Sequence, residues 1–310
     1  MPLLRIDSTD DGPIVHASPQ SATARLRHLA RGTGPVVIMV HGFKFSPGDP
    51  VHCPHKHILS TRDATCRKAV SWPRLLGFGA GMPDEGLAVA FGWQARGTVW
   101  QAWERAEKAG RQLADIIREI RNIAPSRPVH CIAHSMGARV VLSAIQRIEK
   151  GALNKVILLA GAEFSSTAEQ AMQSPGGQGA QVFNITSREN DLYDFALERL
   201  VAPEGDFSIG RAFPIVSNSL TIQLDNNPTL TALRQLGFPI AAPTRRICHW
   251  SAYLRAGVFP FYQALMRNET DDYLAALKLR LPQDSQPRWS RLLARPQFSL
   301  PLPVFSKATP

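Results

Sequence analysis

Ser135 is the residue of this sequence best placed to act as a nucleophile. It lies between a short apolar run that ends at His134 and a helical pattern that begins at Gly137. A serine at a sharp turn from strand to helix needs small residues two positions before and after it, and Ala133 and Gly137 occupy these positions. The following helix points backbone N–H groups at any negative charge that develops there. A helix N-cap serine needs neither small neighbour, so the pattern favours a reactive serine.

The run Ala133-His134-Ser135-Met136-Gly137 resembles the nucleophile elbow of the α/β-hydrolase superfamily, Gly-x-Ser-x-Gly, with alanine in place of the first glycine. The resemblance covers roughly residues 35–250. The combination of motifs in this range is similar to that of bacterial esterase-like families. It implies the α/β-hydrolase fold, an α/β class with a mainly parallel central sheet and helices on both faces. It also implies two partners for the serine, an acid and then a histidine in chain order.

The acid is expected at the end of the strand that follows the elbow region. The apolar run 181–186 predicts such a strand, and a polar turn over 187–191 follows it directly. By resemblance, Asp191 is the best match for the triad acid. Glu189 is second, and Glu163, which follows the preceding predicted strand, is third.

The histidine follows from order alone. The chain has nine histidines, and only His249 lies after the acid. The resemblance thus implies that His249 is the general base of Ser135 and that Asp191 orients its ring. The alternative is a histidine that packs beside Trp250 without a catalytic role.

A second part of the family pattern lies upstream. An apolar run from Pro35 ends in His41-Gly42-Phe43 and looks like the strand and loop that donate one oxyanion-hole N–H. By resemblance, the backbone amides of Phe43 and Met136 form the oxyanion hole. We expect His41 to brace this loop by hydrogen bonding rather than to titrate.

Alternating strand and helix patterns must position these residues. Strands are predicted at 35–43, 87–93, 128–134, 155–160 and 181–186, and a long amphipathic helix at 99–123. The alternation predicts one catalytic domain over 1–272, with a C-terminal extension over 273–310 that is basic and rich in proline.

Residues 200–243 are expected to form a cap-like insertion, because the spacing from Asp191 to His249 exceeds the need of one helix and one strand. An acyl pocket is expected between this segment and the residues Phe45, Trp93 and His134 beside the site. Ordinary core packing is an equal alternative for the apolar side chains of the segment. These side chains are Phe207, Phe213, Ile215, Leu220, Ile222 and Phe238.

Composition limits the other classes of function. The chain is 44% hydrophobic, and no stretch approaches the roughly 20 apolar residues of a membrane span. The net charge is +10, but residues 273–310 hold six basic residues against Asp284 alone, so half of the excess lies in the extension. We therefore expect no nucleic-acid partner. The extension either wraps the catalytic domain through Trp289, Leu292, Leu293 and Phe298, which we favour, or offers a basic surface to an anionic lipid or polymer.

The cysteines and the N-terminus bear on compartment. The four cysteines lie in distant segments and fit free thiols in a reducing cytoplasm. Residues 1–7 show no apolar region of a signal peptide. These features predict a cytoplasmic protein.

Four metal-ligand residue types crowd one short segment. They are His52, Cys53, His55 and His57. Pro54 and Lys56 interrupt a regular presentation, and the sequence shows no second ligand cluster, so we expect a polar loop without zinc. No cofactor or metal is expected.

The predicted function is a serine hydrolase that cleaves small carboxylic esters of short to medium acyl chain through an acyl-enzyme. Acyl transfer, thioester cleavage and amide cleavage use the same triad and remain alternatives. A non-catalytic binding protein that keeps the fold is the alternative outside enzymes.

Overall fold

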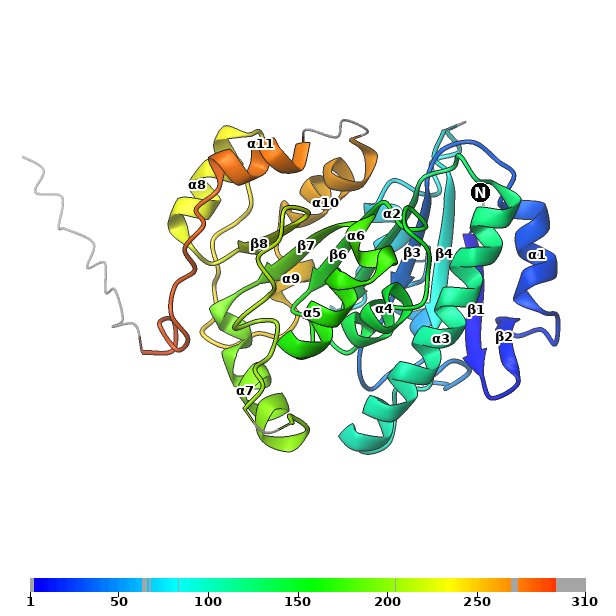
Figure 1. The fold of residues 1–310 in the computed structure, drawn as a ribbon, viewed down its shortest axis with the longest axis horizontal. Helices are drawn as coiled ribbons and strands as arrows, with labels where there is room; N and C mark the ends of the chain where they lie inside the picture. Colours follow the sequence, from blue (N-terminus) through cyan, green and yellow to red (C-terminus); the bar gives the residue numbers. More distant parts are fainter. Residues whose placement is uncertain are drawn as a thin grey trace, which may run out of the picture.

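An eight-stranded sheet forms the centre of the protein (Figure 1). This computed structural model describes residues 3–62, 66, 68–82, 84–203, 205–268 and 273–293. The strand order is β2-β1-β4-β3-β5-β6-β7-β8, and every neighbouring pair is parallel except β1 with β2. The strands are β1 (Leu3–Thr9), β2 (Gly12–Val15), β3 (Val36–Val40), β4 (Leu87–Gly92), β5 (Val129–His134), β6 (Lys155–Leu159), β7 (Gln181–Thr186) and β8 (Ser219–Gln223).

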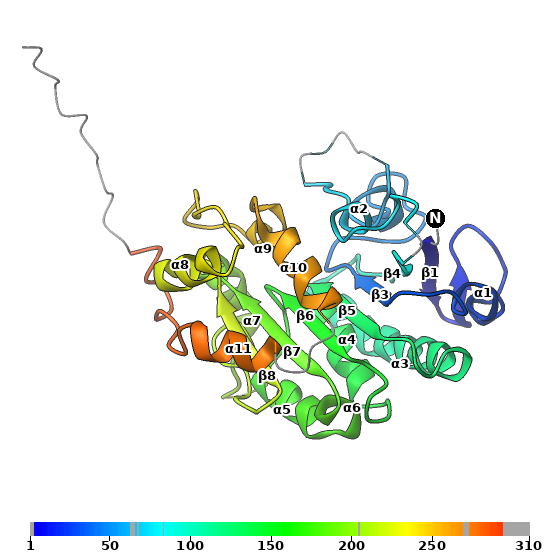
Figure 2. The same cartoon turned by 90° about the horizontal axis from the view of Figure 1, so that it is seen from above.

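Helices cover both faces of this sheet (Figure 2). One face packs against α1 (Ala22–Leu29), α3 (Val99–Ile123), α4 (Gly137–Ile145) and α5 (Ser165–Gln173). The other packs against α2 (Trp72–Leu75), α8 (Asn227–Gln235), α9 (Ser251–Leu254), α10 (Val258–Arg267) and α11 (Tyr273–Arg280). The remaining helical elements are α6 (Pro175–Gln178), α7 (Asp191–Leu200) and the short 3-10 helices η1 (Pro54–Lys56) and η2 (Arg188–Asn190).

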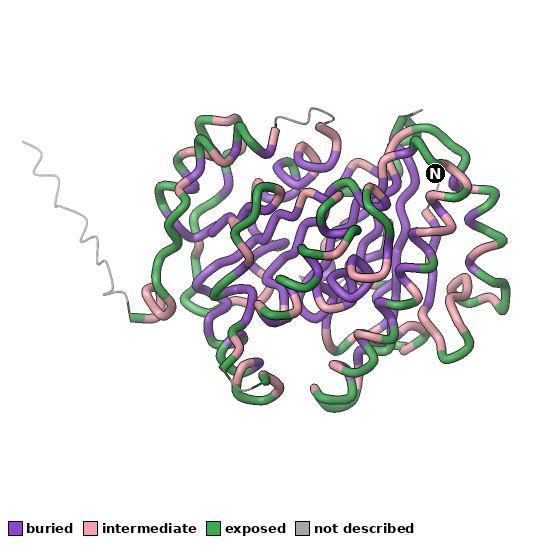
Figure 3. The backbone as a smooth tube through the Cα atoms, viewed as in Figure 1, coloured by how far each residue is buried: buried purple, intermediate pink, exposed green. Residues whose placement is uncertain are grey.

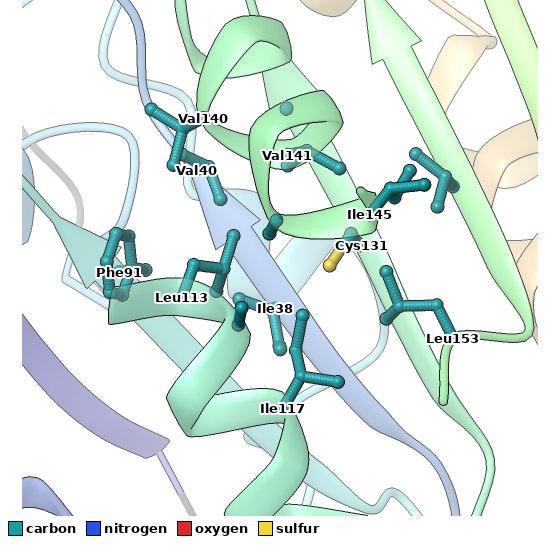
Figure 4. Packing of buried hydrophobic residues seen from close by; sticks show 14 of the residues in the cluster. Ile38, Val40, Phe91, Leu113, Ile117, Cys131, Val140, Val141, Ile145 and Leu153 are labelled. Atoms are coloured by element: carbon teal, nitrogen blue, oxygen red, sulfur yellow. The ribbon is translucent and has the colours of Figure 1, made fainter. Parts of the chain in front are cut away.

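The central strands are apolar throughout because both of their faces are covered. In β3, Val36, Ile38 and Val40 belong to the core beneath α3 and α4, whereas Val37 and Met39 belong to the core on the opposite face. This is the two-residue alternation of a strand with both sides buried. Figure 3 shows the buried sheet, and Figure 4 shows Ile38 and Val40 packed with side chains of α3 and α4.

The predicted fold class is confirmed, and most predicted elements are present. The helix predicted over 99–123 is α3, with the same bounds. It starts with a capping box in which Thr98 Oγ1 accepts from the Gln101 amide at 3.3 Å and Gln101 Oε1 accepts from the Thr98 amide at 3.1 Å. The sequence analysis did not predict the N-terminal strands β1 and β2, which extend the sheet beyond β4.

Residues 200–243 do not form a cap as a whole. They supply β8, the last strand of the sheet, and α8, which packs on one of its faces. Phe213 and Leu220 lie in the cores on opposite sides of the sheet, and Ile215 is 99% exposed. The prediction that these side chains form one apolar wall over the active site is therefore wrong. They lie in the core on one side of the sheet, in the core on the other side, or in solvent.

The C-terminal extension begins inside the core and continues along α7. Leu274 and Leu277 of α11 pack in the same core as α10. Further on, the Trp289 ring lies 5.7 Å from that of Phe195 on α7, whereas Leu293 is 77% exposed. Phe298 lies outside the described residues.

Two further findings concern the chain as a whole. No helix in the described ranges has both the length and the apolar content needed to cross a membrane. All four cysteines are unpaired, and Cys53 and Cys131 are buried.

Candidate active site

Ser135 occupies the turn between β5 and α4 in a strained backbone conformation. Its φ is +55°, in the left-handed region that non-glycine residues rarely adopt. Internal hydrogen bonds hold this turn: the Ser135 amide donates to the Leu159 carbonyl at 3.0 Å, and the Ser135 carbonyl accepts from the amides of Ala138 and Ala162 at 2.9 Å. Because the backbone is fixed by β6 and by the next loop, the hydroxyl has a defined position at the carboxyl edge of the sheet.

Small residues around the elbow are required by close backbone contacts. A Cβ atom added at Gly137 would lie 2.7 Å from the His41 carbonyl oxygen. One added at Gly42 would lie 2.7 Å from the Ser135 Cβ and 2.8 Å from the His134 carbonyl oxygen. All three distances are shorter than real Cβ contacts, so the elbow and the loop after β3 approach each other across two glycines.

His249 contacts the serine as the sequence predicts. Its Nε2 lies 2.9 Å from the Ser135 Oγ. The Tyr193 ring stacks on one side at a centroid distance of 4.6 Å, and the His134 ring lies 4.7 Å away. Burial of the ring, together with the nearby His134, holds the pKa of His249 well below its usual value. The imidazole is therefore neutral at pH 7 and able to accept a proton.

The residue that orients His249 is Asn190, not Asp191. The His249 Nδ1–H donates to the Asn190 Oδ1 at 2.6 Å, which leaves the lone pair of Nε2 for the serine hydroxyl. Asp191 points elsewhere: its carboxylate accepts from Arg188 at 3.1 Å and from the Trp289 amide at 2.7 Å. The prediction that Asp191 contacts the histidine is thus wrong. Asn190 ends η2 and Asp191 begins α7, so the two side chains leave the turn in different directions.

A buried carboxyl group stands behind Asn190. The Asn190 Nδ2 donates to the Asp194 Oδ1 at 3.0 Å, which fixes the amide with its oxygen toward His249. Burial outweighs the opposing charges of Arg288 and Arg188 and raises the pKa of Asp194 to about 7. The four residues Ser135, His249, Asn190 and Asp194 therefore form one hydrogen-bonded chain.

The other two acid candidates serve structural ion pairs. Glu189 pairs with Arg255, and both side chains are at least 95% buried. Glu163 accepts from Arg139 at 2.8 Å and from the Phe164 amide at 2.8 Å. Neither carboxylate is among the contacts of His249.

The loop that follows β3 lies against the elbow as expected. Among the described residues, no internal hydrogen bond uses the backbone N–H of Phe43 or of Met136. His41 braces the loop: its Nδ1–H donates to the Gly42 carbonyl at 2.9 Å, and its Nε2 accepts from the Trp93 amide at 3.0 Å. Burial lowers the pKa of His41 to about 3, so this ring is a neutral structural group.

The three residues expected to line an acyl pocket have other roles. Trp93 is fully buried, and its Nε1–H donates to the His41 carbonyl at 3.0 Å. His134 is buried too, and its Nε2–H donates to the His249 carbonyl at 3.0 Å, so it positions the histidine. Phe45 packs edge-on to His41 with ring centroids 5.3 Å apart. Trp93 and His134 therefore support the site from within, and Phe45 is partly exposed beside His41.

A cavity of about 400 Å³ is lined by Cys248 and Trp250, the sequence neighbours of His249, but neither His249 nor Ser135 belongs to its wall. Lys68 and Trp250 form part of its wall, with the Lys68 ammonium 3.2 Å from the centre of the Trp250 ring. The wall is completed by both small apolar and polar residues, namely Val70, Glu189, Ala241, Ala242, Thr244, Arg245, Cys248, Ser251, Leu254, Arg255 and Ala256.

The sequence of the chain matches one protein family. The sequence profile of the family described as "Alpha/beta hydrolase of unknown function (DUF900)" matches residues 18–175, about half of the chain. The chain belongs to this family. The matched region contains the loop at Phe43 and the elbow at Ser135, and it ends before Asn190 and His249.

Individual proteins are similar over parts of the chain. The rice "Transmembrane and coiled-coil domain-containing protein STS1" is 32% identical over 99 residues, which are 27% of this chain and 14% of the rice protein. The chain thus matches only a small part of that relative. Among solved structures, it is similar to Legionella pneumophila phospholipase PlaB in complex with thio-NAD (12% identity, 79% of this chain and 61% of that chain, TM-score 0.43). It is also similar to an α/β hydrolase fold protein from Nakamurella multipartita (11% identity, 85% and 99%, TM-score 0.39). TM-scores below 0.5 carry no information on activity.

Asn190 was not predicted because only a carboxylate was expected as the partner of the histidine, and Asp194 and Tyr193 lie beyond the turn where that carboxylate was expected. An amide oxygen can also orient an imidazole, as the Cys-His-Asn variant of the triad illustrates. Asn190 lies beside the predicted acid in the same turn. A search for any acceptor in that turn would have included it.

Proposed function

We propose that this protein is a serine hydrolase that cleaves carboxylic esters of short to medium acyl chain. The observation that carries the proposal is the 2.9 Å contact of His249 Nε2 with a serine whose φ is +55°. A strained serine beside a neutral imidazole is the arrangement of an activated nucleophile.

In the proposed mechanism, Ser135 Oγ attacks the ester carbonyl while His249 Nε2 takes the hydroxyl proton. The C–O bond to the alcohol breaks, and His249 returns the proton to the leaving alkoxide. Water then attacks the acyl-enzyme with His249 again as the base. The backbone N–H groups of Met136 and Phe43 stabilise the oxyanion, at about 3 kcal/mol for each donor.

Asn190 and Asp194 keep His249 in the productive tautomer during both steps. The neutral amide of Asn190 places no charge beside the imidazolium that forms on His249. In the hydrogen-bonded chain the nearest carboxyl group is that of Asp194, one hydrogen bond beyond Asn190. We infer that orientation of the ring is the main contribution of Asn190.

We infer that the acyl chain of the substrate enters the cavity of about 400 Å³ whose wall includes Trp250, the residue after His249. This volume lies within the range of small-molecule sites. Each methylene that enters such a cavity adds about 0.8 kcal/mol, or roughly a fourfold gain. We therefore expect kcat/KM on chromogenic esters to rise from acetyl to butanoyl or hexanoyl and then to fall. A maximum at about twelve carbons with activation at an oil interface would contradict this substrate class.

A fluorophosphonate probe tests the nucleophile directly, because it phosphonylates an activated serine and releases fluoride. We expect the probe to label Ser135 of the wild type. In Ser135→Ala both the labelling and the ester turnover should disappear, while circular dichroism of this variant shows an intact fold. Ser166→Ala, on α5 and hydrogen-bonded to Asp206, is the matched control and keeps both signals. Full turnover in folded Ser135→Ala would exclude the proposal. Parallel assays with a thioester, an anilide and an alcohol acceptor separate ester hydrolysis from its alternatives.

A further inference from the structure

A second cluster of chemically competent side chains lies outside the serine site. It joins Asp7 near the end of β1, His16 directly after β2 and His55 in η1. One ligand atom from each of the three lies within 4.8 Å of the others. Asp7 Oδ2 is 2.7 Å from His16 Nδ1, and Asp7 Oδ1 is 2.7 Å from His55 Nε2.

This set differs from the histidine-rich loop seen in the sequence. His52 turns away and pairs with Asp49, with 3.3 Å between His52 Nδ1 and Asp49 Oδ1. His57 packs against Phe45 with ring centroids 5.1 Å apart. Only His55 enters the cluster, and the two other ligands come from the N-terminal hairpin.

We propose that Asp7, His16 and His55 bind one divalent transition-metal ion of the zinc class. One carboxylate and two imidazoles are a ligand set that zinc accepts, and a fourth position remains for water. Ligand atoms around a tetrahedral zinc lie about 3.3 Å apart. The present 2.7 Å contacts reach this spacing through small side-chain rotations, which His16 and Asp7 can make because their side chains are 14% and 11% exposed.

The surroundings of the three ligands hold the two imidazole rings in place. His55 has a fully buried side chain, and no described residue bonds to its Nδ1, so an ion bound at Nε2 would leave the ring proton on Nδ1. On the far side of His16, Nε2 lies 3.9 Å from the Cys53 Sγ, which orients the ring with Nδ1 toward the cluster.

Gly92 leaves the space between the ligands open. A Cβ atom there would lie 2.8 Å from His55 Nε2 and 3.1 Å from Asp7 Oδ1. The next residue, Trp93, donates its amide hydrogen to His41 of the oxyanion loop. A bound ion would therefore tie β1, the end of β2 and the loop after β3 together, as a structural metal does.

The alternative is a metal-free cluster in which both histidines donate to the Asp7 carboxylate. The two accounts differ in metal affinity, which is measured without any enzyme assay. Protein purified without a histidine tag is treated with a chelator and then titrated with Zn²⁺ by calorimetry and with Co²⁺ by visible absorption. We expect one equivalent of each metal to bind at micromolar or lower concentration, a tetrahedral Co²⁺ spectrum, and a rise of a few degrees in the zinc-loaded Tm.

Variants assign the ligands. His55→Ala and Asp7→Asn should lower the Zn²⁺ affinity at least 100-fold and abolish the Tm rise. His52→Ala, a histidine of the same loop outside the cluster, should bind as the wild type does. If the buried His55 variant fails to fold, His16→Gln at the more exposed ligand gives the same test. The proposal is overturned if the wild type binds less than a tenth of an equivalent, or if Asp7→Asn and His16→Gln keep wild-type affinity.

Discussion

Asn190 and Asp191 are sequence neighbours with different contacts, and this difference gives a sharp prediction. Asn190→Ala removes the acceptor of His249 Nδ1 and should lower kcat by about 10²- to 10³-fold, because the ring loses its tautomer and orientation. Asp191→Asn keeps an acceptor for the Trp289 amide and should change kcat by only a few fold. Steady-state kinetics with an ester, alongside thermal melts, compares the two. A larger loss of kcat in Asp191→Asn would restore the carboxylate as the orienting group.

The raised pKa of Asp194 leads us to expect that the free energy of unfolding depends on pH. Its pKa of about 7 in the folded protein lies above the ordinary value, so the folded state binds this proton more tightly than the unfolded chain does. The favourable contribution is complete below about pH 4 and is lost as the pH rises through about 7. The loss is on the order of 4 kcal/mol.

Asp194→Asn should remove this part of the pH dependence. Urea unfolding at pH 4 to 8 should show that the free energy of unfolding of the variant declines less with pH than that of the wild type. Asp115→Asn, at an exposed position on α3, is the control and should follow the wild type. Parallel curves for Asp194→Asn and the wild type would exclude a buried carboxyl group that titrates on unfolding.

At the scale of elements, we expect the contact between the loop after β3 and the elbow to hold the Ser135 side chain in position. Gly42→Ala places a methyl group against the Ser135 Cβ and the His134 carbonyl, so the loop or the elbow must move. We expect kcat to fall at least tenfold, because displacements of about 1 Å in a catalytic site cost that much or more. Gly32→Ala, where the nearest atom to the new Cβ is 3.7 Å away, is the matched control. Equal kinetics of the two variants would show that the loop yields without disturbing the serine.

At the scale of the whole molecule, the C-terminal segment supports α7, the helix that contains Asp194. Arg288 makes two hydrogen bonds to Glu198 of α7, at 2.6 and 3.1 Å, and the Trp289 amide donates to the Asp191 carboxylate at 2.7 Å. Because the Arg288 and Glu198 side chains are only 14% and 10% exposed, their coupling should exceed that of a surface pair.

A double-mutant cycle measures this support. Arg288→Ala and Glu198→Ala should each lower Tm, and their coupling free energy should be about 1–3 kcal/mol. Arg288→Ala should also lower kcat, since α7 contains Asp194. Arg280→Ala, at the exposed end of α11, controls for the loss of one positive charge. A coupling near zero would show that the segment lies on α7 without stabilising it.

Several local elements and the position of the elbow serine can be read from the sequence alone. The helix over 99–123 follows from the helical spacing of its apolar residues, and the buried strands follow from short apolar runs. Ser135 between small residues determined the elbow, and chain order singled out His249. These features are local: their cause lies within a few residues, so pattern alone reveals them.

Which side chains contact one another depends on the long-range packing of the chain. Every residue from 187 to 191 is polar, so periodicity cannot show which of them faces His249. His249 contacts Asn190 and the Trp289 amide contacts Asp191, and both of these partners are remote in sequence. The same holds for Asp7, His16 and His55, which are separated by up to 48 positions and meet because β2 pairs with β1, and because η1 contacts β4, the other neighbour of β1. Long-range pairing of strands brings such residues together, and no short sequence window records it.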